Sequence, residues 1–247
     1  MERPRYELID TLRGLAIFCV IVYHFIYDLV HFYSMDFPWF EGWGAYMVQQ
    51  GGVCLFILIS GAMSLCAKKP LRNGLFLVAC GLMITLATHI YSPGSIIVFG
   101  ILSLLGWAAV LTVLFSPLLK KMPEKPGIVL SLLLFLLTHD LADGSLSFLG
   151  IHLYDLPSSW YESRVLFPLG LPHASFVSAD YFPLLPWIFP YWIGYYFWQL
   201  LGEDFKKKHL LKGLPIFSVM GRHSLLIYLA HQPILLIVCF LLFGNNR

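Results

Sequence analysis

Charged residues are scarce in this sequence. Only 12% of its 247 residues are aspartate, glutamate, lysine or arginine, whereas 58% are hydrophobic. A soluble domain carries about 25% charged residues, because its surface must be polar. The apolar residues also come in blocks, several of them near the roughly 20 residues that a helix needs to cross a bilayer. The composition therefore excludes a water-soluble globule and predicts a protein embedded in a membrane.

Several functional patterns are missing as well. The net charge is only +2 and the basic residues form no stripe, which argues against a nucleic-acid partner. No Walker loop, dinucleotide fingerprint, nucleophile elbow or zinc-protease motif occurs. We expect no metal site, because the cysteines lack ligand spacing and the loop histidines are scattered. These residues are Cys19, Cys54, Cys66, Cys80, Cys239, His139, His152 and His173.

The apolar blocks predict an all-α, polytopic transmembrane helix bundle in a single domain covering residues 1–247. About seven spans are expected, at residues 10–33, 46–67, 72–91, 95–117, 127–142, 183–202 and 223–243. The sixth begins with Pro183, Pro186 and Pro190, so its first turns should be irregular. Pro233 should kink the seventh span.

The loop charges predict the orientation of these spans. Lysine and arginine gather in alternate loops, and the other loops hold mainly acidic residues with one basic residue, Arg164. Because basic loops stay on the cytoplasmic side, the N-terminus is expected inside and the C-terminus outside. The long connection at about 143–182 then lies outside, where its aromatic residues and prolines predict an ordered cap, re-entrant or interfacial. The basic residues are Arg3, Arg5, Lys68, Lys69, Arg72, Lys120, Lys121, Lys125, Lys206, Lys207, Lys208, Lys212 and Arg222, and Glu41 is one of the acidic residues.

Five ionisable side chains share one face of the first span. At 100° per residue and with His24 at zero, Asp10 and Asp28 fall near about +40°, and Arg13 and His31 near about −20°. In contact with lipid, such a row would cost several kcal/mol per charge, so it must face protein or water. The row predicts a functional site; the alternative is that these groups only pair with other helices.

The positions along this face suggest a role for each group. Asp28 is one turn from His24, so its carboxylate could fix the imidazole tautomer and make His24 a general base. Arg13 lies about 16 Å away along the axis, at the cytoplasmic end, where with Asp10 it could anchor a phosphate-bearing ligand. His31 is expected to contact substrate at the outer end.

Further candidates lie on other spans. Arg222 and Ser224 stand at the cytoplasmic start of the last span, where Ser224 is a predicted N-cap and the helix N-terminus would attract phosphate. His231, farther along that span, is expected either to line the site or to be a structural histidine. His89 and Asp180 lie near the outer ends of their spans and are candidates for binding an acceptor.

Five short motifs, in order along the chain, resemble a known family. They are DTLRGLA at 10–16 followed by His24, FILISG at 56–61, FGIL at 99–102, DYFPLLPW at 180–187 and GRHSLLIYLAHQP at 221–233. Arg13 and His24 have the ten-residue separation found on the first helix of the acyltransferase-3 family. The whole set resembles the small bacterial relatives of heparan-α-glucosaminide N-acetyltransferase more closely.

This resemblance implies transfer of an acetyl group from cytoplasmic acetyl-CoA to an amine or hydroxyl of a saccharide-like acceptor. It implies that His24 activates the acceptor or carries the acyl group transiently, that Arg13 helps to hold CoA, and that the bilayer is a bacterial cytoplasmic membrane. The sequence leaves a homo-oligomer open. Two departures from the family are the smaller number of spans and Ser103, which follows FGIL where relatives commonly have histidine.

Two other functions compete with acyl transfer. Rows of aspartate and histidine within membranes also serve as proton relays, so a proton-coupled transporter is the alternative. Transporters are often built from inverted repeats with broken helices in both halves, and the sequence lacks this pattern. A non-enzymatic scaffold is disfavoured, because it has no need of so costly a polar row.

Overall fold

The computed structural model describes residues 5–40 and 42–244. Arg3 and Glu41, two of the charges used to orient the spans, lie outside the described residues. The contacts of the chain gather in two compact units, Met1–Phe56 with Leu201–Arg247, and Ile57–Leu200. A single domain over residues 1–247 remains a prediction.

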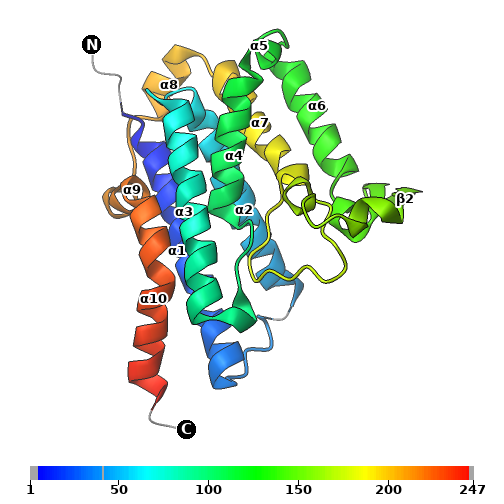
Figure 1. Ribbon diagram of the computed structural model, residues 1–247. Coiled ribbons are helices and arrows are strands. Elements are labelled where there is room, and N and C mark those ends of the chain that lie inside the picture. The colour runs from blue at the N-terminus through cyan, green and yellow to red at the C-terminus, as the bar shows by residue number, and fades with distance from the viewer. Residues whose placement is uncertain (1–4, 41, 245–247) are drawn as a thin grey trace. The chain divides into compact units, whose positions relative to one another are not determined.

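The first unit is built around a 27-residue helix, α1 (Glu7–Tyr33). It also contains most of α2 (Trp43–Ser64), followed after residue 200 by α8 (Glu203–His209), α9 (Pro215–Arg222) and α10 (Ser224–Phe243). Both α9 and α10 pack against α1, and Figure 1 shows α10, in red, running alongside α1, in blue. The two ends of the chain thus meet in one helical unit.

The second unit contains two helix pairs. Helix α3 (Pro70–Tyr91) packs on α4 (Ile101–Leu114), and α6 (Glu124–Leu137) packs on α7 (Leu184–Leu200). The short helix α5 (Ser116–Leu119) follows α4. The 3-10 turn η1 (Pro93–Ser95) separates α3 from α4.

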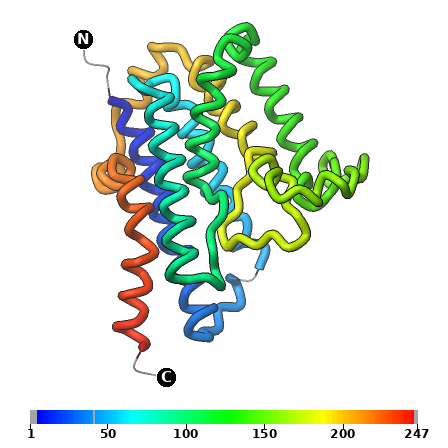
Figure 2. Tube along the Cα trace, viewed as in Figure 1, coloured from blue at the N-terminus to red at the C-terminus, as the bar shows by residue number. Residues whose placement is uncertain are grey.

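The segment predicted as a loop at about 143–182 contains a β-hairpin. Strand β1 (Ser145–Phe148) pairs antiparallel with β2 (Ile151–Asp155), a finding that amends the all-α prediction. The intervening Leu149 and Gly150 both have positive φ, as a two-residue hairpin turn requires. Figure 2 traces this segment in yellow-green and yellow between α6 and α7. Its 3-10 turns are η2 (Leu141–Asp143), η3 (Ser158–Glu162) and η4 (Phe167–Leu169).

Each predicted span contains a helix, so the helical assignment is confirmed. Among the described residues, five helical segments are long and apolar enough to cross a membrane: Glu7–Tyr33, Trp43–Ser64, Pro70–Tyr91, Glu124–Asp143 and Ser224–Phe243. Helix α4 has 14 residues, which is short of a full span, and α7 has 17, with the non-helical Leu185 among them. The chain is therefore an integral membrane protein, while the count of seven and the orientation remain predictions.

Helices α7 and α10 each contain an internal proline, but their backbone geometries differ. Within α7, Leu185 has the non-helical angles φ −99° and ψ 127°, which confirms the irregular start predicted for that span. Pro233 lies inside α10, which continues as one helix through it. The exposed faces of the long helices are apolar: Leu82 on α3 is 63% exposed and Leu241 on α10 is 73% exposed. A surface of this kind suits contact with lipid chains.

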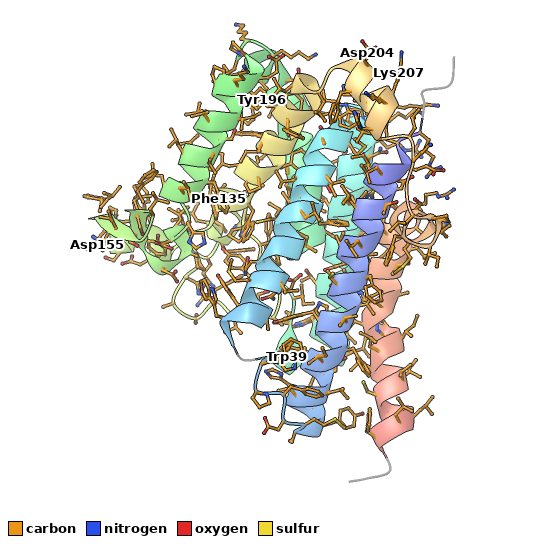
Figure 3. All side chains as sticks on the ribbon, turned by 180° about the vertical axis from the view of Figure 1, so that it is seen from behind. Trp39, Phe135, Asp155, Tyr196, Asp204 and Lys207 are labelled. Carbon is orange, nitrogen blue, oxygen red and sulfur yellow. The ribbon has the colours of Figure 1, made fainter. Side chains whose placement is uncertain are left out.

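The segment 203–222, expected as a cytoplasmic loop, contains α8 and α9. Asp204 and Lys207 on α8 are labelled in Figure 3. Helix α9 crosses α1 so closely that a Cβ atom added to Gly14 would lie 1.9 Å from the carbonyl oxygen of Phe217. A Cβ added to Gly221 would lie 1.8 Å from the carbonyl oxygen of Asp10. The two helices can therefore cross this closely only because both positions are glycine. The crossing in turn places the start of α10 beside the polar face of α1.

Candidate active site

The crossing of α1 and α9 is tied by hydroxyl groups as well as by glycine. The Thr11 and Ser218 hydroxyl oxygens are 2.8 Å apart, and Ser218 also donates to the Glu7 carbonyl oxygen at 3.2 Å. Thr11 further accepts a hydrogen bond from the backbone N–H of Leu214 at 3.0 Å. Because buried polar groups must be paired, these bonds fix the register of α9 on the N-terminal half of α1.

Arg13 points from α1 to the first residue of α10. Its Nη2 donates to the Ser224 hydroxyl oxygen at 2.9 Å, and Ser224 is 1% exposed. The N-cap position of α10 is His223 and the helix begins at Ser224, so the prediction that Ser224 is the N-cap was wrong. Its hydroxyl instead accepts a hydrogen bond from Arg13. Both residues are candidates for holding CoA, and the fold brings them together.

Asp10 is paired with a residue just before α1. Its carboxylate accepts a hydrogen bond from Arg5 at 2.8 Å, on the exposed side of the helix start. The Nε of Arg13 is buried and has no hydrogen-bond partner among the described residues. A guanidinium nitrogen in this condition can still donate to an anionic ligand.

Asp28 is fully buried and is bound by the facing helix. Gln232 on α10 donates from Nε2 to both carboxylate oxygens, at 2.9 and 3.0 Å. Within the described part of the chain Asp28 makes no hydrogen bond to His24, so the expected His24–Asp28 pair is not formed. Both carboxylate oxygens of Asp28 are instead occupied by the amide group of Gln232 on the facing helix.

His24 faces a second histidine instead. The ring centroids of His24 and His231 are 5.0 Å apart with an interplanar angle of 58°, and Tyr23 lies edge-on to His24 at 5.9 Å. His231 is only 8% exposed, and its Nδ1 lies 2.5 Å from the Tyr228 carbonyl oxygen. The geometry thus joins His231, a substrate-site candidate, directly to His24.

Two other candidates in this unit are placed at its surface. His31 is exposed, stacks on Tyr27 with centroids 4.0 Å apart, and has its Nδ1 3.1 Å from the Tyr27 carbonyl oxygen. Arg222 is exposed, and its Nε donates to the Ser218 carbonyl oxygen at 3.3 Å. Their proposed contacts with substrate and cofactor remain predictions.

His89 and Asp180 belong to the second unit. His89 is exposed in the last turn of α3. Asp180 Oδ2 accepts a hydrogen bond from the backbone N–H of Ile101, the first residue of α4, at 3.4 Å. A Cβ added to Gly100 would lie 2.7 Å from the same oxygen. Asp180 therefore holds the start of α4, where a carboxylate also complements the helix dipole.

Gln232 and the Tyr228 carbonyl are the site components that the sequence analysis missed. A signal for Gln232 was available, since an amide inside an apolar span is costly unless it is paired. The carbonyl of Tyr228 carries no sequence signal of its own. Over residues 5–40 and 42–244, no group of three or more His, Cys, Asp or Glu side chains could hold a metal ion.

An apolar pocket adjoins this site, and Tyr23, which packs edge-on against His24, is one of the residues that line it. Phe18 and Val22 on α1 line it together with Trp39 and Phe40, and Figure 3 labels Trp39 in the segment joining α1 to α2. At 100° per residue, Phe18 and Val22 lie about 120° and 160° around the helix from His24. The polar face and the apolar pocket thus occupy different faces of the same helix.

Long apolar helices, two of which bury polar contacts between them, are the features of an integral membrane protein. Residues 5–233 match the family model described as heparan-alpha-glucosaminide N-acetyltransferase, catalytic. The chain belongs to this family and is by that membership a membrane acetyltransferase. No curated protein and no solved structure matches it. The resemblance to the heparan-α-glucosaminide enzymes is confirmed, while the relation to the acyltransferase-3 family and a bacterial source remain predictions.

Proposed function

We propose that this protein transfers an acetyl group from cytoplasmic acetyl-CoA to the amine or hydroxyl of a saccharide-like acceptor. The observation that carries the proposal is the polar face of α1, in a chain whose family is one of acetyltransferases. Arg13 and His24 stand on that face, and each is met by a polar side chain of α10. Polar side chains between two apolar helices suit a reaction in which a charged donor reaches its acceptor within the membrane.

Arg13 is the proposed anchor for the donor. A guanidinium binds phosphate through several N–H groups in a fixed plane, and CoA carries phosphates at the end remote from its thioester. Ser224 holds one side of the guanidinium, and the buried Nε is left without a protein partner among the described residues. Arg222 and Asp10 complete the proposed donor end.

His24 is the proposed general base, with transient acylation of its ring as the other possibility. Attack on the thioester needs an acceptor nitrogen or oxygen that loses its proton as the bond forms. His24 stands about 16 Å along α1 from Arg13, so it is remote from the phosphate anchor, as the thioester end of CoA is from its phosphates. Asp28 lies one turn beyond it and adds negative charge near an imidazole that becomes cationic.

Two measurements on detergent-purified protein test this function. Calorimetry with acetyl-CoA is expected to give saturable binding that Arg13→Ala weakens and His24→Ala leaves intact. Acetyl transfer to glucosamine, used as the probe acceptor, is expected to disappear in His24→Ala. Lys207→Ala, which removes an exposed lysine on α8, is the matched control and should behave as the wild type. Absence of acetyl-CoA binding to folded protein would favour the proton-coupled transporter instead.

A further inference from the structure

The tautomer of His231 follows from its surroundings. A carbonyl oxygen only accepts hydrogen bonds, so the Nδ1 atom that lies 2.5 Å from the Tyr228 carbonyl must carry a hydrogen. In the neutral imidazole the other nitrogen, Nε2, then has a free lone pair. That Nε2 is buried and has no hydrogen-bond partner among the residues that the structure describes. His231 therefore presents a bare acceptor nitrogen in the interior.

His24 is the complementary member of the pair. Over the described residues no hydrogen bond holds its ring, which is positioned by packing against Tyr23 and His231. With centroids 5.0 Å apart, the two rings are close enough for a nitrogen of His24 to reach hydrogen-bonding distance of His231 Nε2 when the two atoms point at each other. Only His231 has a fixed tautomer, so it is the imidazole prepared to receive a proton.

We propose that His231 is the proton acceptor for His24, so that the two imidazoles act as a relay. This step rests on the acetyl-transfer function proposed above. As an acceptor amine attacks the thioester carbonyl, its N–H proton passes to one nitrogen of His24. The proton on the other His24 nitrogen passes to His231 Nε2.

The bonds and charges of this step balance. The new acetyl C–N bond forms, the C–S bond breaks, and the sulfur leaves with the electron pair as the CoA thiolate. His24 ends neutral, and His231 becomes a cation whose Nδ1–H remains bonded to the Tyr228 carbonyl. The Nε2 proton then returns through His24 to the thiolate, which restores both rings.

The charged groups around His231 are few. Helix α1 presents His24 and, one turn on, Asp28, whose carboxylate is bound by Gln232 beside His231. Arg13 contacts α10 at Ser224, about two turns earlier. On α9 the one ionisable side chain is Arg222, which is exposed. Asp28 is thus the nearby anion that favours a positive charge on this histidine pair.

The first test measures the tautomer without any substrate. NMR of protein labelled with nitrogen-15 histidine, with the His231 signal assigned by its loss in His231→Gln or His231→Asn, should show Nδ1 protonated and Nε2 unprotonated in the neutral form. A protonated Nε2 in the neutral form would overturn the proposal, because that nitrogen could not accept a proton from His24.

The second test measures catalysis with acetyl-CoA and glucosamine. His231→Gln keeps a polar side chain but cannot take up a proton, so kcat should fall about 100-fold or more while both KM values stay near those of the wild type. The residual rate should keep rising with pH where the wild-type rate has levelled off, because solvent must now take the proton. His209→Gln, which changes an exposed histidine on α8, is the control and should leave kcat unchanged.

The outcomes separate this proposal from the function on which it rests. A wild type that transfers acetyl, combined with a His231→Gln variant of normal kcat and unchanged pH profile, overturns the relay alone. A lower melting temperature with unchanged kcat would mean that His231 is only structural. A wild type that neither binds acetyl-CoA nor transfers acetyl overturns the proposed function, and the relay with it.

Discussion

At the residue scale, the contact between Asp28 and Gln232 decides how a carboxyl group can be kept inside an apolar helix pair. Burying a carboxylate costs desolvation free energy, which hydrogen bonds to the carboxylate offset. If the hydrogen-bond donor is removed, that free energy is no longer offset. Gln232 reaches both oxygens from α10, so the amide is a condition for keeping Asp28 in the interior. The pair also ties α10 to α1 next to the two histidines, one residue beyond His231 and one turn beyond His24.

We expect Gln232→Leu to lower the free energy of unfolding by about 1.5–3 kcal/mol, the usual worth of a hydrogen bond to a charged group. Thermal denaturation in detergent measures the change. The double variant Asp28→Leu with Gln232→Leu should recover part of the loss, because no polar group is then left unpaired. Equal losses in the single and double variants would contradict this account of the pair.

At the element scale, the position of α9 depends on the absence of side chains at Gly14 and Gly221. At each glycine, an added Cβ atom would overlap a carbonyl oxygen of the other helix. The helix backbone cannot shift enough to remove this overlap without moving the whole helix. Thr11 and Ser218 add hydrogen bonds at the same crossing. Because α10 follows α9 after a single residue, the crossing also sets where Ser224 meets Arg13.

Substitution Gly221→Val should force α9 off α1 and destabilise the protein by at least the roughly 1–3 kcal/mol typical of overpacking. Acetyl-CoA affinity should fall with it, since Ser224 would no longer hold Arg13. Gly51→Ala in α2 is the matched control: a Cβ there meets nothing within 4 Å, and alanine favours a helix by up to about 1 kcal/mol. Equal melting temperatures for Gly221→Val and the wild type would contradict the close packing of α9 on α1 at Gly221.

In the β1–β2 hairpin, the turn requires a positive φ at a position occupied by leucine. Leu149 has φ 52°, in a region where a left-handed conformation costs an ordinary residue about 1–2 kcal/mol. Leu149→Asn creates the Asn-Gly pair that such turns favour. Hydrogen exchange of the β1 and β2 amides should slow by about fivefold or more, as roughly 1 kcal/mol of strain is relieved. Exchange rates that stay the same would show that the turn is not limited by Leu149.

At the scale of the whole molecule, the distribution of charged loops predicts which side of the membrane each segment faces. Asp155 at the end of the hairpin and Lys207 on α8 are exposed and lie in loops assigned to opposite sides. In a variant without native cysteines, Asp155→Cys should react with a membrane-impermeant maleimide in intact cells. Lys207→Cys should react only after the membrane is permeabilised. Labelling of both from outside would overturn the predicted orientation.

The helices and the polar face of α1 could be predicted because both depend on local sequence. Blocks of apolar residues at span length produced a helix at each expected place, and a period of 3.6 residues aligned Asp28 with His24. Helix α9 was missed because its eight residues are too few to span a membrane and follow a lysine-rich segment. The turn at Leu149 was missed because leucine is not a residue that signals positive φ.

By itself, the sequence determined that this chain is a helical membrane protein and that its first helix carries a row of ionisable groups, because hydrophobic length and helical period are properties of neighbouring residues. Tertiary structure alone decided which groups meet: Arg13 with Ser224, Asp28 with Gln232, and His24 with His231. These partners are about 200 residues apart, and no local pattern specifies such a pairing. It arises where glycines and hydroxyls let α9 dock, which brings α10 onto the polar face of α1.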